Sequence, residues 1–305
     1  MQRTPDHAPL VVVTGANGFV GSRVCAALVQ RGASVRAVVR RAGGAPAIDG
    51  VQEHVGDFGD AAFAAEVLAG ADAAVTTVHP MGSDRETQER VGVQATRTFA
   101  TAARDAGAST LVHVSTAAVY TRDPGVDDVT EDGTLVGDDA GDYGVTKRDA
   151  DAALGEVDGL TRVLVRPPAI LGAGETSVWN ALRPQGIRED EAKRHALPDA
   201  TFAWVHVDDL AALIADVATA AIAPAGDAEQ GPVEGGCTPV NAAAPRATQR
   251  DYVGAVTGAL GVEPVWDDGP VWTGAIVADR ARGWGWTPSV TLEDALRELA
   301  DGLRR

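Results

Sequence analysis

The feature that most constrains the fold is a glycine-rich turn between an apolar run and a helical pattern. Residues 10–13 are continuously apolar, as in a strand buried on both faces of a parallel sheet. A G-x-x-G-x-x-G pattern follows, and residues 18–30 then carry apolar side chains at helical spacing. A turn without Cβ atoms lets the backbone approach a pyrophosphate, and the helix directs the positive end of its dipole at it. We therefore predict a dinucleotide site formed by Gly15, Asn17, Gly18, Phe19, Val20 and Gly21, with a purely structural turn as the alternative.

The alternation of strand and helix continues through the first half of the chain. Further strands are predicted at 34–39, 51–55, 71–78, 110–114 and 160–165, and helices at 61–68, 84–106 and 143–156. This order indicates right-handed βαβ units and a parallel sheet. The predicted fold class is α/β: a Rossmann-type doubly wound parallel sheet with a smaller, mainly C-terminal substrate-binding lobe.

The pattern becomes less regular after the Pro167-Pro168 pair, and this change sets the predicted domain boundaries. We assign residues 1–9 to a flexible N-terminus, 10–171 to the dinucleotide-binding domain, and 172–200 with 223–305 to the substrate-binding lobe. Residues 201–222 are expected to return to the dinucleotide-binding domain. The irregular parts are expected to form loops and short elements around a substrate cleft.

Composition and charge exclude several classes of function. The chain has 26 Lys and Arg against 43 Asp and Glu, a net charge of −17 that would repel nucleic acid. Cys25 and Cys237 lie far apart, and no metal-ligand spacing joins them to the six histidines. No stretch reaches the roughly 18 continuous apolar residues of a membrane span, and residues 1–9 have no apolar signal segment. We expect a cytoplasmic protein without a metal, a nucleic-acid partner or a membrane partner.

The cofactor preference is predicted from the end of the second strand. An NAD-specific fold usually places Asp or Glu there for the ribose hydroxyls, whereas this chain has Arg40 and Arg41 after Val39. Two guanidinium groups can pair bidentately with a 2′-phosphate. The sequence therefore predicts NADP(H) in preference to NAD(H), with a solvated arginine loop as the alternative.

A tyrosine and a lysine stand four residues apart on one face of a predicted helix. They are Tyr143 and Lys147. A positive charge nearby lowers the pKa of a phenol from about 10, so that the phenol can act as an acid or base near neutrality. Taken alone, the pair is more typical of an exposed helix surface.

Further motifs, in order along the chain, give the sequence a family resemblance. They are Gly56-Asp57-Phe58, the segment 114–120 (Val-Ser-Thr-Ala-Ala-Val-Tyr), Arg166-Pro167-Pro168, the segment 205–210 (Val-His-Val-Asp-Asp-Leu) and Gly285-Trp286-Thr287-Pro288. With the glycine-rich turn and the Tyr143/Lys147 pair, the chain resembles the extended short-chain dehydrogenase/reductase family, also called the epimerase/dehydratase-like group.

The resemblance implies a catalytic triad of Thr116, Tyr143 and Lys147. Tyr143 would protonate an alkoxide, while Lys147 would hold the cofactor ribose and lower the tyrosine pKa. Asp57 would bind the adenine, and Phe58 and Pro167 would also belong to the cofactor site. Ser115 is a second candidate hydroxyl, and backbone hydrogen bonds at the strand end are the alternative role for both hydroxyl residues.

The chain departs from the family pattern at several positions. Gly92 stands where the family often has Asn, so any role of that side chain is in doubt. Ala117 and Ala118 replace the acidic pair of sugar dehydratases, which makes dehydration improbable. Asp151 stands where Glu is usual, a minor change that we expect on a helix surface. His79 lies near the expected nicotinamide end; it could touch substrate, but a loop histidine is more often solvated.

The expected function is the NADPH-dependent reduction of a small ketone or aldehyde, with the proton supplied by Tyr143. A nucleotide-sugar epimerase is the first alternative, and it would use cations of the second lobe for a diphosphate: Arg183, Arg188, Lys193, Arg194 and Arg246. A non-catalytic NADP(H)-binding regulator is the second. Core packing is the expected role of the six tryptophans, although several could line an apolar pocket. A homodimer is left open.

Overall fold

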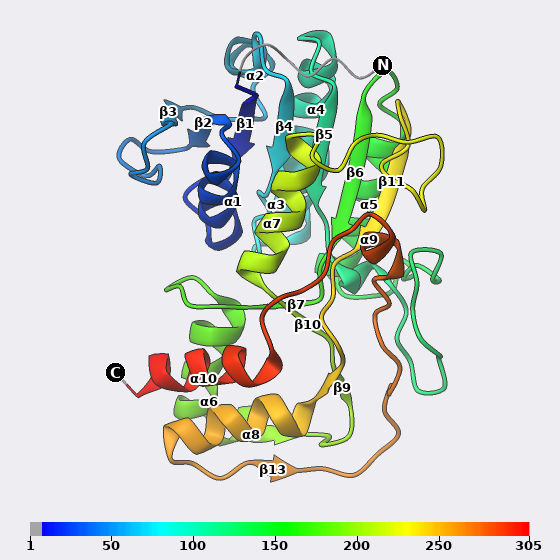
Figure 1. The fold of residues 1–305 in the computed structure, drawn as a ribbon. Helices are drawn as coiled ribbons and strands as arrows, with labels where there is room; N and C mark the ends of the chain where they lie inside the picture. The colour runs from blue at the N-terminus through cyan, green and yellow to red at the C-terminus, as the bar shows by residue number, and fades with distance from the viewer. Residues whose placement is uncertain (1–7, 305) are drawn as a thin grey trace.

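The computed structural model describes residues 8–304, and in this part of the chain the core is a seven-stranded parallel sheet (Figure 1). Its strand order is β11-β6-β5-β4-β1-β2-β3. The strands are β1 (Leu10–Thr14), β2 (Ser34–Val39), β3 (Val51–Val55), β4 (Ala73–Thr76), β5 (Thr110–Val114), β6 (Thr161–Arg166) and β11 (Cys237–Asn241). The predicted α/β Rossmann-type fold is confirmed. Residues 1–7 of the predicted N-terminal arm lie outside the described residues.

Helices cover both faces of the sheet. They are α1 (Phe19–Gln30) and α7 (Val207–Ala218) on one face, and α2 (Ala61–Leu68), α4 (Ala95–Asp105) and α5 (Asp142–Gly155) on the other. Successive residues of β1 alternate between two cores: Val11 and Val13 pack in the cluster of α1 and α7, and Val12 in the cluster of α2, α4 and α5. Burial on both faces explains why β1 is a continuous apolar run from Leu10 to Val13.

The strand order reverses between β1 and β4, because β2 follows β1 on one side while β4 and β5 continue on the other. At such a switch point the connections leave toward opposite faces, and a crevice opens at the carboxyl ends of the strands. The glycine-rich turn after β1 and the loop after β4 both lie at this edge.

One predicted helix is divided in the structure. The expected helix over 84–106 consists of α3 (Arg85–Gln88), a π-helical turn η1 (Glu89–Gln94) and α4. Asp84 caps α3 by accepting a hydrogen bond from the backbone N–H of Thr87 at 2.8 Å. The wide π-helical turn contains Gly92, whose Cα faces the imidazole of His79.

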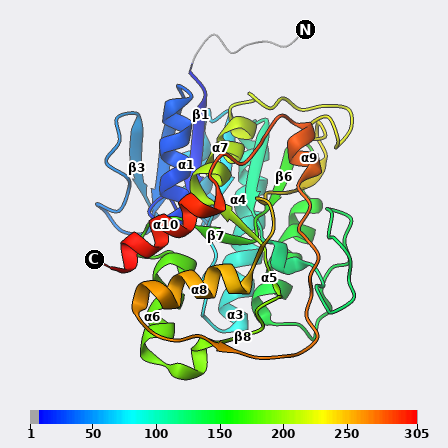
Figure 2. The same ribbon diagram turned by 60° about the horizontal axis from the view of Figure 1, so that its bottom comes forward.

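The second lobe lies beyond the carboxyl ends of the sheet strands, with α8 and α10 packed together in front of them in Figure 2. Its strands form three short pairs: β7 (Ala169–Leu171) with β10 (Trp204–His206), β9 (Thr201–Phe202) with β12 (Ala247–Thr248), and β8 (His195–Ala196) with β13 (Val265–Trp266). The other elements after β6 are η3 (Val178–Leu182), α6 (Arg183–Glu189), η4 (Glu191–Arg194), α8 (Gln249–Leu260), α9 (Asp279–Gly283) and α10 (Leu292–Leu303).

One part of the predicted domain division is wrong. Residues 223–305 were assigned to the substrate-binding lobe, but β11 from this stretch pairs with β6 and forms the edge of the central sheet. The register joins Cys237 to Arg162 and Asn241 to Arg166. The chain therefore returns to the first domain after much of the second lobe has been built.

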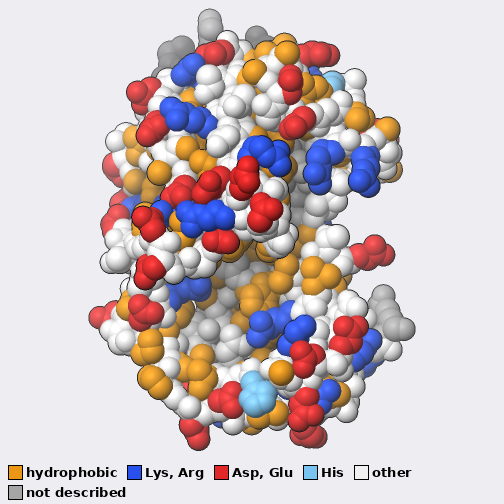
Figure 3. Space-filling model, turned by 180° about the vertical axis from the view of Figure 1, so that it is seen from behind, with side chains coloured by type: hydrophobic (Ala, Val, Ile, Leu, Met, Phe, Trp, Pro, Cys, Tyr) orange, Lys and Arg blue, Asp and Glu red, His pale blue; other side chains and the backbone are white. Residues whose placement is uncertain are grey.

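A hollow separates the upper domain from the lower lobe in Figure 3, and hydrophobic side chains gather inside it. Among the described residues, no helix combines the length and the apolar character that crossing a membrane requires.

Candidate active site

The glycine-rich turn is shaped by two of its three glycines. Gly15 has a φ of +68°, a value that residues other than glycine rarely adopt. A hydrogen bond of 2.9 Å from the N–H of Gly18 to the carbonyl of Gly15 closes the turn. A Cβ on Gly21 would lie 2.2 Å from the Gly15 carbonyl oxygen, so only glycine fits there. Gly18 is less constrained, because its Cβ would meet only that same oxygen, at 3.2 Å, a tight contact that a shift of a few tenths of an ångström would relieve.

The N-terminus of α1 suits an anion. Gly18 is the N-cap residue, no side chain caps the helix within the described structure, and its first turn has no acidic residue. The first backbone N–H groups of a helix need partners, and a phosphate provides them. The turn and α1 thus fit the pyrophosphate of the expected dinucleotide.

The loop after β2 carries Arg40 and Arg41, both exposed. Neither guanidinium has a hydrogen-bond or ion-pair partner in the described part of the chain. The loop is held by Glu53 of β3, which accepts hydrogen bonds from the N–H groups of Gly43 and Ala45, each at 2.9 Å. These two bonds lower the pKa of Glu53. The arginines therefore stand on an ordered loop with their donors available.

The other predicted cofactor residues lie along the same edge of the sheet. The exposed Asp57 follows β3 and accepts a hydrogen bond from the N–H of Gly59 at 2.9 Å, while Phe58 is buried. Asn17 lies in the turn, and Val20 packs against the core from α1. Pro167 follows β6.

The ring of Phe19 faces the loop after β7, where a Cβ on Gly172 or Gly174 would lie 3.3 Å or 2.9 Å from its ring atoms. This loop therefore packs closely on the first residue of α1.

The structure brings Thr116, Tyr143 and Lys147 together at the carboxyl ends of β5 and β6. Thr116 follows β5 and caps the short 3-10 helix η2 (Ala117–Val119), since its hydroxyl accepts from the N–H of Ala118 at 3.1 Å. Tyr143 and Lys147 lie one turn apart in α5. The hydroxyl of Thr116 lies near enough to the Tyr143 phenol to affect its pKa, and it also contacts the Pro167 carbonyl at 3.5 Å. Lys147 is 3% exposed, and its Nζ donates to the carbonyl of Val114 at 2.7 Å.

The electrostatics of the triad differ from the expectation in one respect. We predicted that Lys147 lowers the pKa of Tyr143, whereas burial raises the pKa of this phenol and the nearby hydroxyl of Thr116 offsets only part of that rise. Burial also lowers the pKa of Lys147 to about 8, against the opposing effect of Asp151. The phenol therefore holds its proton near neutral pH, which is the form that a proton donor needs.

Behind the triad lies a buried ion pair that the sequence reading missed. Asp151 is 5% exposed, and its Oδ2 accepts from Nε of Arg166 at 2.9 Å. The expectation that Asp151 lies on a helix surface is thus wrong. Arg166 also donates to the hydroxyl of Tyr120 at 2.8 Å, and Tyr120 donates to Asn241 of β11 at 3.0 Å. Arg166, the charged residue that ends β6 directly after Val163, Leu164 and Val165, was the signal for this network.

His79 is in contact with the triad rather than solvated. Its ring meets the Tyr143 ring edge-on, with centroids 5.0 Å apart and an interplanar angle of 80°. Burial, followed by the charge of Lys147, lowers the pKa of His79 to about 4. His113 on β5 is buried and bonded to Thr76 at 2.7 Å, and His206 caps α7, so both serve the fold.

A cavity of about 680 Å³ opens beside Tyr143, lined by Ala118, Tyr120, Arg122 and the stretch 136–144. Most tryptophans do not line it. Four are buried and donate their indole N–H to backbone carbonyls, as core residues do: Trp204, Trp272, Trp284 and Trp286. Trp272 is the partial exception, because the guanidinium of Arg122 lies 5.8 Å from its ring centroid.

The chain resembles known proteins in sequence and in structure. The model of the NAD dependent epimerase/dehydratase family matches residues 11–227. A 4-hydroxy-2-methyl-3-oxo-4-farnesyl-3,4-dihydroquinoline-1-oxide ketoreductase of Stigmatella aurantiaca is 36% identical over 203 residues, which are 63% of this chain and 56% of the relative. A ceramide reductase of Caulobacter vibrioides is 30% identical over 217 residues, 68% of this chain and 60% of the relative. The matches therefore span little more than half the length of these curated relatives.

Solved structures show the same fold. The Bordetella bronchiseptica enzyme WbmG, in complex with NAD, aligns with a TM-score of 0.73 at 19% identity, covering 99% of this chain and 96% of that one.

Proposed function

This chain belongs to the NAD dependent epimerase/dehydratase family, and we propose that it is an NADPH-dependent reductase of a small ketone or aldehyde. The observation that carries the proposal is the half-buried phenol of Tyr143, whose raised pKa keeps it protonated near neutral pH close to Thr116 and one helical turn from Lys147. The family and the relatives with reductase names support an NAD(P)-dependent enzyme of this type. The carbonyl substrate and the preference for NADPH are the proposed parts.

Each residue of the site has its own proposed role in the reduction. Bound NADPH supplies a hydride to the carbonyl carbon. The hydroxyl of Thr116 orients the carbonyl oxygen, and Tyr143 transfers its phenolic proton to that oxygen, so that an alcohol leaves. Lys147 donates one N–H to Val114 and has others to offer the cofactor ribose. Asp151, which favours the charged form of Lys147, supports that role.

The proposed preference for NADPH rests on Arg40 and Arg41. Their unpaired guanidinium groups on a loop pinned by Glu53 fit a 2′-phosphate, and no carboxylate competes at the end of β2. We further propose, from the cysteine usage alone, that the enzyme works in the cytoplasm.

The nucleotide-sugar epimerase is the weaker candidate, because four of the five cations expected to bind a diphosphate have other partners. Arg188 and Arg194 donate to the carbonyls of Leu303 and Ile187 at 3.3 and 3.1 Å, and Arg246 donates to Thr273. Arg183 lies over the ring of Trp179, 5.2 Å from its centroid.

The test is the loss of NADPH absorbance with a panel of aliphatic ketones, aromatic ketones and aldehydes. Tyr143→Phe should lower turnover by roughly 10²- to 10⁴-fold, the usual contribution of a general acid, with NADPH affinity nearly constant. Lys147→Ala should reduce both. The matched control is Tyr252→Phe, which removes a phenolic oxygen bonded to the Trp179 carbonyl in the second lobe. Near-wild-type turnover of Tyr143→Phe would refute the proposal and favour the NADP(H)-binding regulator.

A further inference from the structure

The imidazole of His79 has one bonded nitrogen and one without a partner. Nε2 lies 3.2 Å from Oε1 of Gln88. Nδ1 is buried and has no hydrogen-bond partner. The two nitrogens therefore differ in their hydrogen bonding, and the contacts of Gln88 decide which of them carries the proton.

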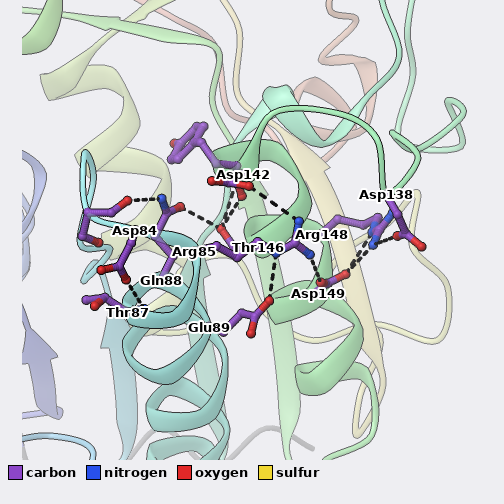
Figure 4. Close-up of polar contacts among 12 residues, drawn as sticks. Asp84, Arg85, Thr87, Gln88, Glu89, Asp138, Asp142, Thr146, Arg148 and Asp149 are labelled. Atoms are coloured by element: carbon purple, nitrogen blue, oxygen red, sulfur yellow. Dashed lines mark hydrogen bonds and ion pairs between the residues drawn. The ribbon is translucent and has the colours of Figure 1, made fainter.

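The side chain of Gln88 fixes the tautomer of His79. Nε2 of Gln88 donates to the carbonyl of Ser83 at 2.8 Å, so its Oε1 is the acceptor that faces His79. The imidazole must then donate from Nε2, which leaves Nδ1 unprotonated. The same Oε1 accepts from the hydroxyl of Thr146 at 3.1 Å, and Figure 4 shows Gln88 reaching from α3 to Thr146 on α5. One buried amide thus ties the His79 loop to the helix that carries Tyr143 and Lys147.

The position of the imidazole explains the glycine in the π-helical turn. A Cβ on Gly92 would lie 3.2 Å from Nδ1 and 3.5 Å from Cε1 of His79, closer than most real Cβ contacts. Gly92 does not have a positive φ, so its backbone conformation does not call for glycine. A glycine within a helix costs up to about 1 kcal/mol relative to alanine. The space that His79 needs accounts for it.

The charge state of His79 is compatible with its neighbours. Lys147 is the charged group that acts on the imidazole, and with burial it holds the pKa at about 4, so that the ring is neutral near pH 7. A neutral ring can pack against the Tyr143 ring without repelling the ammonium beside it.

We propose that His79 is a positioning residue for Tyr143, and that Gly92 is glycine because the imidazole of His79 occupies the space of its side chain. Gln88 holds the imidazole, and the imidazole in turn supports the edge of the phenol ring. The inference rests on the proposed function for the statement that Tyr143 donates the proton. It adds residues from α3, the loop after β4 and η1 to a site otherwise built from β5 and α5.

The experiment is carbon-13 NMR of the protein labelled at its tyrosine rings. Tyr120, Tyr143 and Tyr252 are its three tyrosines, and Tyr143→Phe assigns one signal. His79→Ala and Gly92→Ala should each shift the Tyr143 signal and leave the other two signals in place. The new Cβ at position 92 approaches His79 and not the phenol, so its effect on Tyr143 must pass through the imidazole. The matched controls are Gly254→Ala in α8, where nothing lies within 4 Å of the new Cβ, and His195→Ala in the second lobe. Neither should move the Tyr143 signal.

A double-variant cycle tests the link between the two residues. Gly92→Ala should lower the midpoint of thermal unfolding in the wild-type background and should not lower it in His79→Ala, because the clash is then absent. With a ketone that the wild type reduces, kcat of His79→Ala should fall about 10- to 100-fold, as expected for a misplaced acid, while KM for NADPH changes less than about twofold.

The outcomes separate this inference from the proposed function. Equal effects of Gly92→Ala with and without His79, or an unchanged Tyr143 signal in both single variants, would overturn it. If no carbonyl compound is reduced, the proposed function fails, and the NMR spectra and the unfolding cycle still decide whether His79 positions Tyr143.

Discussion

The substitution Asp151→Asn tests the buried network behind the triad. The carboxylate of Asp151 and the guanidinium of Arg166 are 5% and 7% exposed, with Oδ2 and Nε 2.9 Å apart. An amide keeps the shape of the side chain but removes the negative charge, so Arg166 stays buried without its counter-ion. Its other bonds, to the Tyr120 hydroxyl at 2.8 Å and the Glu131 carbonyl at 3.5 Å, do not replace that charge.

The cost follows from the burial of both groups. Removing one partner of a buried ion pair typically costs about 3–5 kcal/mol. At about 2–4 °C per kcal/mol for a chain approaching this size, the midpoint of thermal unfolding should fall by roughly 10 °C. The matched control is Asp149→Asn on the same helix, whose carboxylate is 35% exposed and pairs with Arg148 at 2.7 Å. An exposed pair of that kind contributes about 0–1 kcal/mol.

The same substitution has a second, electrostatic readout. Asp151 opposes the burial that lowers the pKa of Lys147 to about 8, so removing its charge lowers this pKa further. A lysine loses its charge as the pH rises through its pKa. In the wild type, NADPH binding should therefore weaken above about pH 8, and in Asp151→Asn that decline should begin at a lower pH. Unfolding midpoints and fluorescence titrations with NADPH across pH measure the two effects. An Asp151→Asn protein within about 1 kcal/mol of wild type, with an unshifted titration, would refute this reasoning, since the pair would then be balanced by its own desolvation.

The remaining predictions concern the cofactor site. Arg40→Ala should reduce the preference for NADPH over NADH about tenfold or more, because a hydrogen bond to a charged group is worth about 1.5–3 kcal/mol; an unchanged ratio of the two dissociation constants would remove Arg40 from the 2′-phosphate site, and Arg97→Ala on α4 is the control. Gly18→Val should leave a folded protein that does not bind NADPH, since its Cβ meets only the Gly15 oxygen at 3.2 Å, whereas Gly21→Ala should destabilise the fold itself, with a Cβ 2.2 Å from that oxygen. Circular dichroism and cofactor titration distinguish the two, and retained NADPH affinity in Gly18→Val would show that the turn is only structural.

The elements that the sequence predicted best are strands of the central sheet. Residues 34–39, 51–55 and 110–114 match β2, β3 and β5. In β2 and β5 most residues are buried and valine, a strong strand former, recurs, whereas β3 lies at the sheet edge and has no buried residue. The second lobe was predicted poorly, although signals were present: Thr248 and Asp251 form the capping box of α8, and Gly261 ends that helix with a φ of +69°.

The candidate site divides in the same way. The positions of Thr116, Tyr143 and Lys147 followed from motifs, but their electrostatics depend on burial by elements distant in the chain. A charged residue on a helix is usually exposed, so Asp151 was placed on the surface; only the folded sheet shows that Arg166 enters beside it. Likewise, Gly92 appeared as the loss of a side chain, and its relation to His79 exists only once α3 and η1 pack on α5.

The late arrival of β11 has a consequence for synthesis. A nascent chain delivers β6 to the sheet long before β11, since residues 167–236 must leave the ribosome in between. Until then β6 presents an open edge, although all six of its residues are buried in the finished protein. Such an edge is a template for pairing with other chains. A fragment ending at residue 171 would carry this edge permanently, so the dinucleotide-binding half alone would be prone to aggregate. Much of the second lobe must therefore be synthesised before β11 can complete the sheet of the first domain.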